Sequence, residues 1–157
     1  MSTAPAPWGG PDLRPDGLRF ALDHVGVVVP DLDEATAFFT DVLGFRPVRT
    51  ATIGGPADRL AATFGATDGA TLRVAFLATD GGTVELLEWT APEARADVRA
   101  PQDLGTAHLA LSVPDVEAAA ARLAAAPGVT VFEPSPRGFV YARAPWGLLL
   151  QLVLRRP

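Results

Sequence analysis

The 157-residue chain contains no cysteine and no lysine, one tyrosine and only two histidines. Without cysteine there is no disulfide framework, thiol nucleophile or thiolate metal site, so a metal ion must use histidine, carboxylate, amide or water ligands. All 13 basic residues are arginine, and the formal net charge is −5. This balance argues against broad nucleic-acid binding, which needs clustered positive charge.

Long apolar runs are also missing, since the longest have the length of a strand rather than of a membrane span. The first residues lack a charged region followed by an apolar core, so we expect no signal peptide and a cytoplasmic location. Residues 1–19 are rich in alanine, proline and glycine and are predicted to form a flexible tail. The 48% hydrophobic content suffices for one domain or two small modules with a shared core.

An internal repeat is the strongest positive signal in the sequence. The segment at 23–32 reads DHVGVVVPDL, and the segment at 107–116 reads AHLALSVPDV. Each copy carries one of the two histidines, then a Pro-Asp pair, then an alanine-rich stretch with helical spacing. A repeat of this kind indicates that the fold is built twice.

Each half predicts the order strand, helix, strand, strand, strand. The expected strands are 20–29, 45–51, 72–78 and 83–89 in the first half, and 105–113, 129–132, 138–144 and 148–154 in the second. A helix follows each Pro-Asp pair, and a further short helix is predicted at 58–64. We therefore predict an α+β fold of two tandem βαβββ modules, residues 20–90 and 105–155, joined by a connector at 91–104.

Strand alternation places four polar side chains on equivalent faces. His24 and His108 lie on the first strands, and Glu85 and Gln151 lie near the middle of the last strands, each opposite the strongly apolar face. We expect the four to line one concave surface. Ordinary readings remain open for each: a core or surface histidine, a glutamate paired with Arg73, and a hydrogen-bonded core amide.

The chain resembles the vicinal oxygen chelate superfamily, which includes glyoxalases, methylmalonyl-CoA epimerases, extradiol dioxygenases and bleomycin-resistance proteins. The resemblance covers about 20–154 and is carried by 22–26 (LDHVG), 43–45 (LGF), 84–89 (VELLEW), 105–109 (GTAHL) and 145–152 (PWGLLLQL). It implies a curved mixed sheet around a concave cleft. It also implies a divalent metal ion, such as Zn, Ni, Co, Mn or Fe, whose ligands are His24, Glu85, His108 and Gln151.

In such enzymes the metal chelates two adjacent substrate oxygens and stabilises an enolate-like intermediate. The resemblance therefore implies a metal-dependent isomerase, epimerase or lyase acting on a small oxygenated molecule. Related sequences usually carry glutamate where this chain has Gln151, and an amide cannot accept a proton near neutral pH. Glu85 is accordingly the expected base, with Tyr141 as the second catalytic candidate.

Three further residues are candidates for substrate binding. Arg143 and Arg73 suit bidentate contacts with a carboxylate or phosphate, and Trp89 suits a pocket wall. Glu88, on the face opposite Glu85, is predicted to face solvent. A non-haem Fe(II) dioxygenase and a metal-free drug-binding resistance protein are the alternative functions. Short strands leave edges that need covering, so we expect a homodimer.

Overall fold

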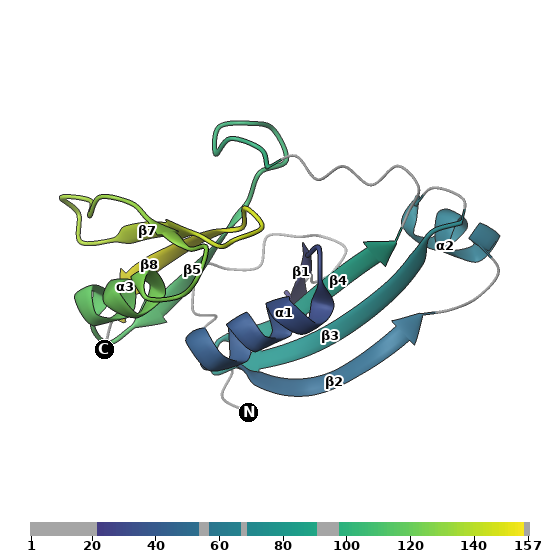
Figure 1. The fold of residues 1–157 in the computed structure, drawn as a ribbon, viewed down its shortest axis with the longest axis horizontal. Coiled ribbons are helices and arrows are strands. Elements are labelled where there is room, and N and C mark those ends of the chain that lie inside the picture. Colours follow the sequence, from purple (N-terminus) through teal and green to yellow (C-terminus); the bar gives the residue numbers. More distant parts are fainter. Residues whose placement is uncertain (1–21, 54–56, 67–68, 91–97, 156–157) are drawn as a thin grey trace, which may run out of the picture.

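The computed structural model describes residues 22–53, 57–66, 69–90 and 98–155 (Figure 1). The predicted tail at 1–19, and residues 91–97 of the predicted connector, lie outside the described residues. No helix in the described part of the chain is long and apolar enough to cross a membrane.

The first module forms a four-stranded mixed sheet in the order β1-β4-β3-β2. The first strand pairs in parallel with the last, and the other neighbours are antiparallel. The elements are β1 (His24–Val28), α1 (Leu32–Ala37), η1 (Phe38–Val42), β2 (Arg46–Ile53), α2 (Ala57–Phe64), β3 (Thr71–Thr79) and β4 (Gly82–Thr90).

The second module repeats this topology in a sheet of its own, in the order β5-β8-β7-β6, again with its first and last strands parallel. The elements are β5 (His108–Val113), α3 (Val116–Ala124), β6 (Thr130–Val131), β7 (Val140–Arg143) and β8 (Leu149–Leu154). The predicted tandem βαβββ fold is thus confirmed. Figure 1 shows the second module at the left and α2 at the opposite end of the first module.

The helix predicted after the first Pro-Asp pair changes character halfway along. Asp31 caps it by accepting a hydrogen bond from the Glu34 amide at 2.8 Å, and α1 then continues into η1, a π-helix. The Leu43 amide donates to the Phe38 carbonyl, five residues earlier, at 3.3 Å. The wider turn accompanies the burial of two consecutive aromatic side chains, Phe38 and Phe39. The sequence pattern alone predicts an uninterrupted α-helix here.

The two modules share one hydrophobic core. Apolar side chains from β1, α1, η1, β3 and β4 form a single cluster with those from α3, β7 and β8. Trp146 packs its indole edge-on against the ring of Phe38, with ring centroids 5.3 Å apart. Arg122 of α3 donates to the carbonyls of Asp41 and Val42 at the end of η1. Packing and polar contacts therefore both hold the modules together.

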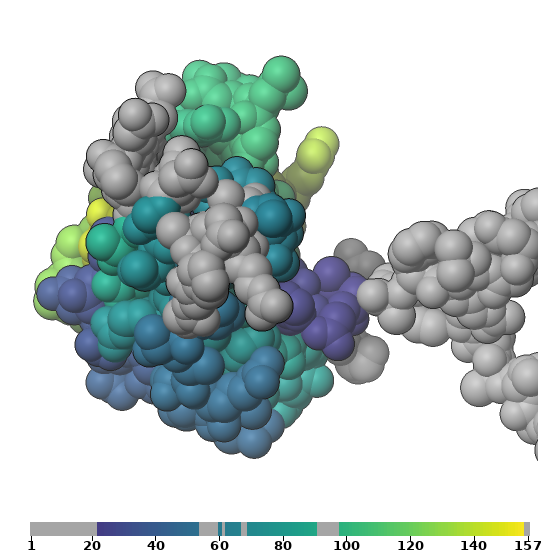
Figure 2. All heavy atoms as spheres, turned by 90° about the vertical axis from the view of Figure 1, so that its right-hand side faces the viewer, coloured from purple at the N-terminus to yellow at the C-terminus, as the bar shows by residue number. Residues whose placement is uncertain are grey.

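In the space-filling view from the α2 end, the first module fills most of the visible face (Figure 2). The green segment that precedes β5 rises above it. The far end of the first sheet is covered by α2, whose Leu60 is buried and whose Phe64 ring lies against Trp89 of β4, with centroids 5.5 Å apart. The opposite end of the sheet, where β1 begins, is free of this cover.

Candidate metal centre

The parallel pairing of β1 with β4 brings His24 and Glu85 together. Gly26 lies beside Glu85 in the register, so the imidazole and the carboxylate project from the same face of neighbouring strands. The His24 Nε2 atom is 3.2 Å from Glu85 Oε2. Glu85 is largely sheltered, with 17% of its side chain exposed, and His24 is 37% exposed. The structure thus assembles two of the four predicted ligands.

Asp23 contacts the other nitrogen of this imidazole. His24 Nδ1 is 2.7 Å from Asp23 Oδ2. The hydrogen bond with Asp23, joined by the negative charge of Glu85, raises the pKa of His24 above its ordinary value. Asp23 precedes β1, which begins at His24, so the alternation of the strand does not direct its side chain to the opposite face. An aspartate that orients a histidine ring is typical of the surroundings of metal ligands.

The second module presents its predicted residues on one face as well. In the register, Gln151 lies between Ala110 of β5 and Tyr141 of β7, so these strands direct His108, Gln151 and Tyr141 to the same side. The Tyr141 ring meets the His108 ring edge-on, with centroids 5.4 Å apart. His108 is exposed.

The two halves of the predicted site remain apart. Among the described residues, no three histidine or carboxylate side chains lie close enough together to hold a metal ion. Both histidines nevertheless line the same groove of about 2030 Å³, whose walls include β1, the β3–β4 turn, β5 and the end of β8. The groove therefore has one imidazole from each module.

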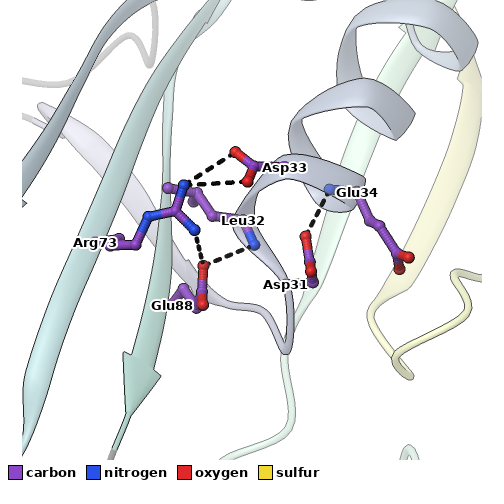
Figure 3. Close-up of polar contacts among 6 residues, drawn as sticks. All are labelled: Asp31, Leu32, Asp33, Glu34, Arg73 and Glu88. Atoms are coloured by element: carbon purple, nitrogen blue, oxygen red, sulfur yellow. Dashed lines mark hydrogen bonds and ion pairs between the residues drawn. The ribbon is translucent and has the colours of Figure 1, made fainter.

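Arg73 occupies the opposite face of the first sheet from Glu85. Its guanidinium contacts Glu88 at 2.9 Å and Asp33 at 3.0 Å (Figure 3). The hydrogen bond with Asp33 raises the pKa of Arg73. Since Arg73 pairs with Glu88, it is not the partner of Glu85. The geometry offers no support for a role of Arg73 in substrate binding.

Glu88 is not the solvent-facing residue that alternation predicts. Its side chain is only 20% exposed, and its Oε2 accepts hydrogen bonds from Arg73 and from the amide of Leu32 at 3.0 Å. The first turn of a helix has free amides and a partial positive charge, which attract a carboxylate. Glu88 therefore fastens the start of α1 to β4.

The remaining substrate-binding candidates lie on the sheet faces that carry Glu85 and Tyr141. Trp89 shares the face of Glu85, but at the distant end covered by Phe64. Arg143 shares the face of Tyr141 and lies over Phe132, with its guanidinium carbon 5.8 Å from the ring centre.

Phe76 and Arg49 form a stacked pair beside Glu85 and His24 that the sequence pattern did not predict. The Phe76 ring lies edge-on to His24, with centroids 5.8 Å apart, and the Arg49 guanidinium lies 4.2 Å above the Phe76 ring centre.

Comparison with known proteins places the chain in a family. The model of the Glyoxalase/Bleomycin resistance protein/Dioxygenase superfamily matches residues 21–152. The chain belongs to this superfamily. The resemblance inferred from the sequence is thereby confirmed, and it extends over both modules of this superfamily member.

One curated relative and several solved structures are similar to this superfamily member. The 2-epi-5-epi-valiolone epimerase of Actinomyces sp. is 38% identical over 143 residues, which cover 85% of this chain and 78% of the relative. A glyoxalase family protein from Bacillus cereus has a TM-score of 0.75 at 22% identity, covering 88% of this chain and 96% of its own.

A second solved structure, FosX from Listeria monocytogenes in complex with Mn(II) and sulfate, has a TM-score of 0.59 at 18% identity. The alignment covers 88% of this chain and 95% of FosX. These structural similarities establish the fold, whereas the curated relative supports an enzyme of the epimerase or isomerase type.

Proposed function

We propose that the chain is an epimerase that inverts a carbon next to a carbonyl group in a small hydroxy ketone. An example is 2-epi-5-epi-valiolone, the compound for which the curated relative is named. The observation that carries the proposal is the contact of 3.2 Å between His24 Nε2 and Glu85 Oε2 on neighbouring strands of the first sheet. Inversion at such a carbon needs a base to remove a proton and an acid to return one. Glu85 supplies a sheltered carboxylate for the first task.

The proposed cofactor is a divalent metal ion held by His24, Glu85, His108 and Gln151. The donor set is chemically suitable, because an imidazole and a carboxylate already face each other and Asp23 orients the imidazole. A bound divalent ion would polarise a substrate carbonyl and so acidify the neighbouring carbon. His108 and Gln151 must approach the first pair to complete the shell.

We propose that a second copy of the chain helps to bring His108 and Gln151 close to His24 and Glu85. Among the described strands, the one that carries the histidine lies at the edge of each sheet and has a strand neighbour on one side only. Val28 at the end of β1 is 64% exposed. Because open edges favour pairing with further strands, we propose a homodimer in which β1 and β5 are covered.

The two modules carry different candidate proton-transfer groups. Glu85 lies on the first module, and Tyr141 lies beside His108 on the second. Epimerisation requires removal of the proton from one side of the carbon and its return from the other. We propose that Glu85 takes the proton and that the Tyr141 hydroxyl returns it, since Gln151 can do neither near neutral pH.

The test follows the reacting proton directly. Metal-reconstituted protein is incubated with 2-epi-5-epi-valiolone in D₂O, and NMR measures both the epimer and deuterium at the inverted carbon. We expect Glu85→Gln to abolish deuterium incorporation, and Tyr141→Phe to retain incorporation but slow the appearance of the epimer. Glu117→Gln, an exposed residue of α3, is the matched control. Full activity of Glu85→Gln, or of wild-type protein freed of divalent metal, contradicts the proposal.

A further inference from the structure

We propose that Arg46 and Arg49 form an anion-binding edge on the face of the first sheet that carries His24 and Glu85, and that this edge anchors a phosphate or carboxylate group of the substrate. This inference rests on the proposed function, because it assigns the substrate class of the same site. Both arginines lie on β2, the edge strand farthest from β1.

The strand register places both side chains on the face that carries the candidate metal ligands. Arg49 lies beside Phe76, and Phe76 lies beside Glu85. Arg46 lies beside Ala78, which lies beside Thr83, the neighbour of His24. Neighbours in a register project to the same side of a sheet. Each arginine therefore lies at the β2 end of a line of neighbouring residues that crosses the sheet from β1.

A β-bulge is responsible for this shared orientation. The pairing of β2 with β3 shifts between Pro47 and Arg49, which leaves Val48 as the extra residue. In a regular strand, residues three apart point to opposite faces, so Arg46 and Arg49 would be separated. The bulge instead directs both toward the face of His24 and Glu85 and leaves Val48, which is 61% exposed, outside the ladder. Bulges frequently redirect a side chain next to a functional site.

The contact with Phe76 leaves the hydrogen-bonding edge of Arg49 available. The guanidinium lies over the ring at 4.2 Å, a contact that uses its face. Its N–H groups radiate in the plane of the guanidinium and suit bidentate contact with a carboxylate or phosphate. Among the described carboxylates, none forms an ion pair with Arg46 or Arg49.

Geometry also sets the size of the substrate. The backbones that carry Glu85 and Arg49 are two strand spacings apart, or about 10 Å. The Arg49 guanidinium lies over the Phe76 ring of the strand between them, so it is closer to Glu85 than the backbones are. A substrate with its reacting carbon over Glu85 and its anionic group at Arg49 therefore spans less than this distance, as a single ring with a short arm does.

The first experiment measures the binding of inorganic phosphate by isothermal titration calorimetry, without turnover. We expect saturable binding to the wild-type protein, weakened about tenfold or more in Arg49→Ala and in Arg46→Ala. Arg49→Lys keeps the charge but not the bidentate fork, and an intermediate affinity is expected. Arg99→Ala makes the same change of charge outside the groove and should bind as wild-type does.

The second experiment compares the neutral hydroxy ketone with its phosphorylated and carboxylated derivatives. We expect a lower KM for an anionic derivative, and loss of that advantage in Arg49→Ala with little change in kcat. Preference for the phosphate or for the carboxylate identifies the anion. Equal phosphate binding by Arg49→Ala and wild-type protein overturns the anion site. Glu85→Gln separates the two proposals: it should retain phosphate binding even though it loses deuterium exchange.

Discussion

Two glutamates on β4 should have opposite roles, although only two residues separate them. Glu88 points to the α1 side of the first sheet, and Glu85 points to the opposite face, where it contacts His24. We predict that Glu88→Ala destabilises the protein while the groove keeps its geometry. Glu85→Ala should leave stability nearly unchanged and remove the proposed activity. The pair tests the assignment of the two faces directly.

The expected loss for Glu88→Ala comes mainly from one hydrogen bond. The carboxylate accepts the Leu32 amide at 3.0 Å, and its removal leaves a first-turn helix amide without this partner. A hydrogen bond to a charged group contributes about 1.5–3 kcal/mol. The ion pair with Arg73, whose side chain is 43% exposed, adds little, because solvent screens such pairs. A loss of about 2 kcal/mol corresponds to a Tm lower by about 4–8 °C.

Urea denaturation followed by circular dichroism measures this difference. The midpoint should fall for Glu88→Ala with an unchanged m value, since the same surface is exposed on unfolding. Glu88→Gln keeps an acceptor oxygen, so its urea midpoint should lie between those of the wild-type protein and Glu88→Ala. Equal stability losses for Glu85→Ala and Glu88→Ala would refute the assignment of the two glutamates to opposite faces.

Two other changes follow from single contacts. Asp23→Asn should lower the pKa of His24 toward its ordinary value, as measured by NMR titration of the ring. Because the folded-state pKa is raised, the stabilisation is present below the ordinary pKa and disappears as the pH rises through the raised value. The variant should therefore lose stability at pH 5 but not at pH 9. Gly147→Ala should cost about 1–3 kcal/mol, because φ is +96° and the new Cβ would lie 2.5 Å from Val98 Cγ1. Val98→Ala should recover part of that loss, and no recovery in thermal unfolding would count against the clash.

Much of the first-module site could be predicted from local patterns. The repeat aligned the two histidines, and the period of two along a strand placed Glu85 opposite the apolar face. Both steps need only the sequence. The structure adds the parallel pairing that brings His24 within 3.2 Å of Glu85.

The residues that sequence reasoning missed depend on interactions between distant segments. The role of Glu88 follows from its contacts with Leu32 and Arg73, which are distant in the sequence, and the alternation of side chains along a strand cannot predict such contacts. The common face of Arg46 and Arg49 follows from a bulge that is defined only relative to β3. The burial of both Phe38 and Phe39 depends on the second module, because Trp146 packs against them.

The parallel pairing of first and last strands has a consequence for the order of folding. In each module the first strand can pair with its neighbour only after the rest of the module has been synthesised. About sixty residues separate β1 from its partner β4. The antiparallel pair β3–β4 is joined by a tight turn and forms from local contacts. Loop closure penalises distant pairings, so we expect the hairpin to fold early and β1 to dock late. His24 then contacts Glu85 only in the last step of folding. These two candidate metal ligands therefore come together only when the module is complete.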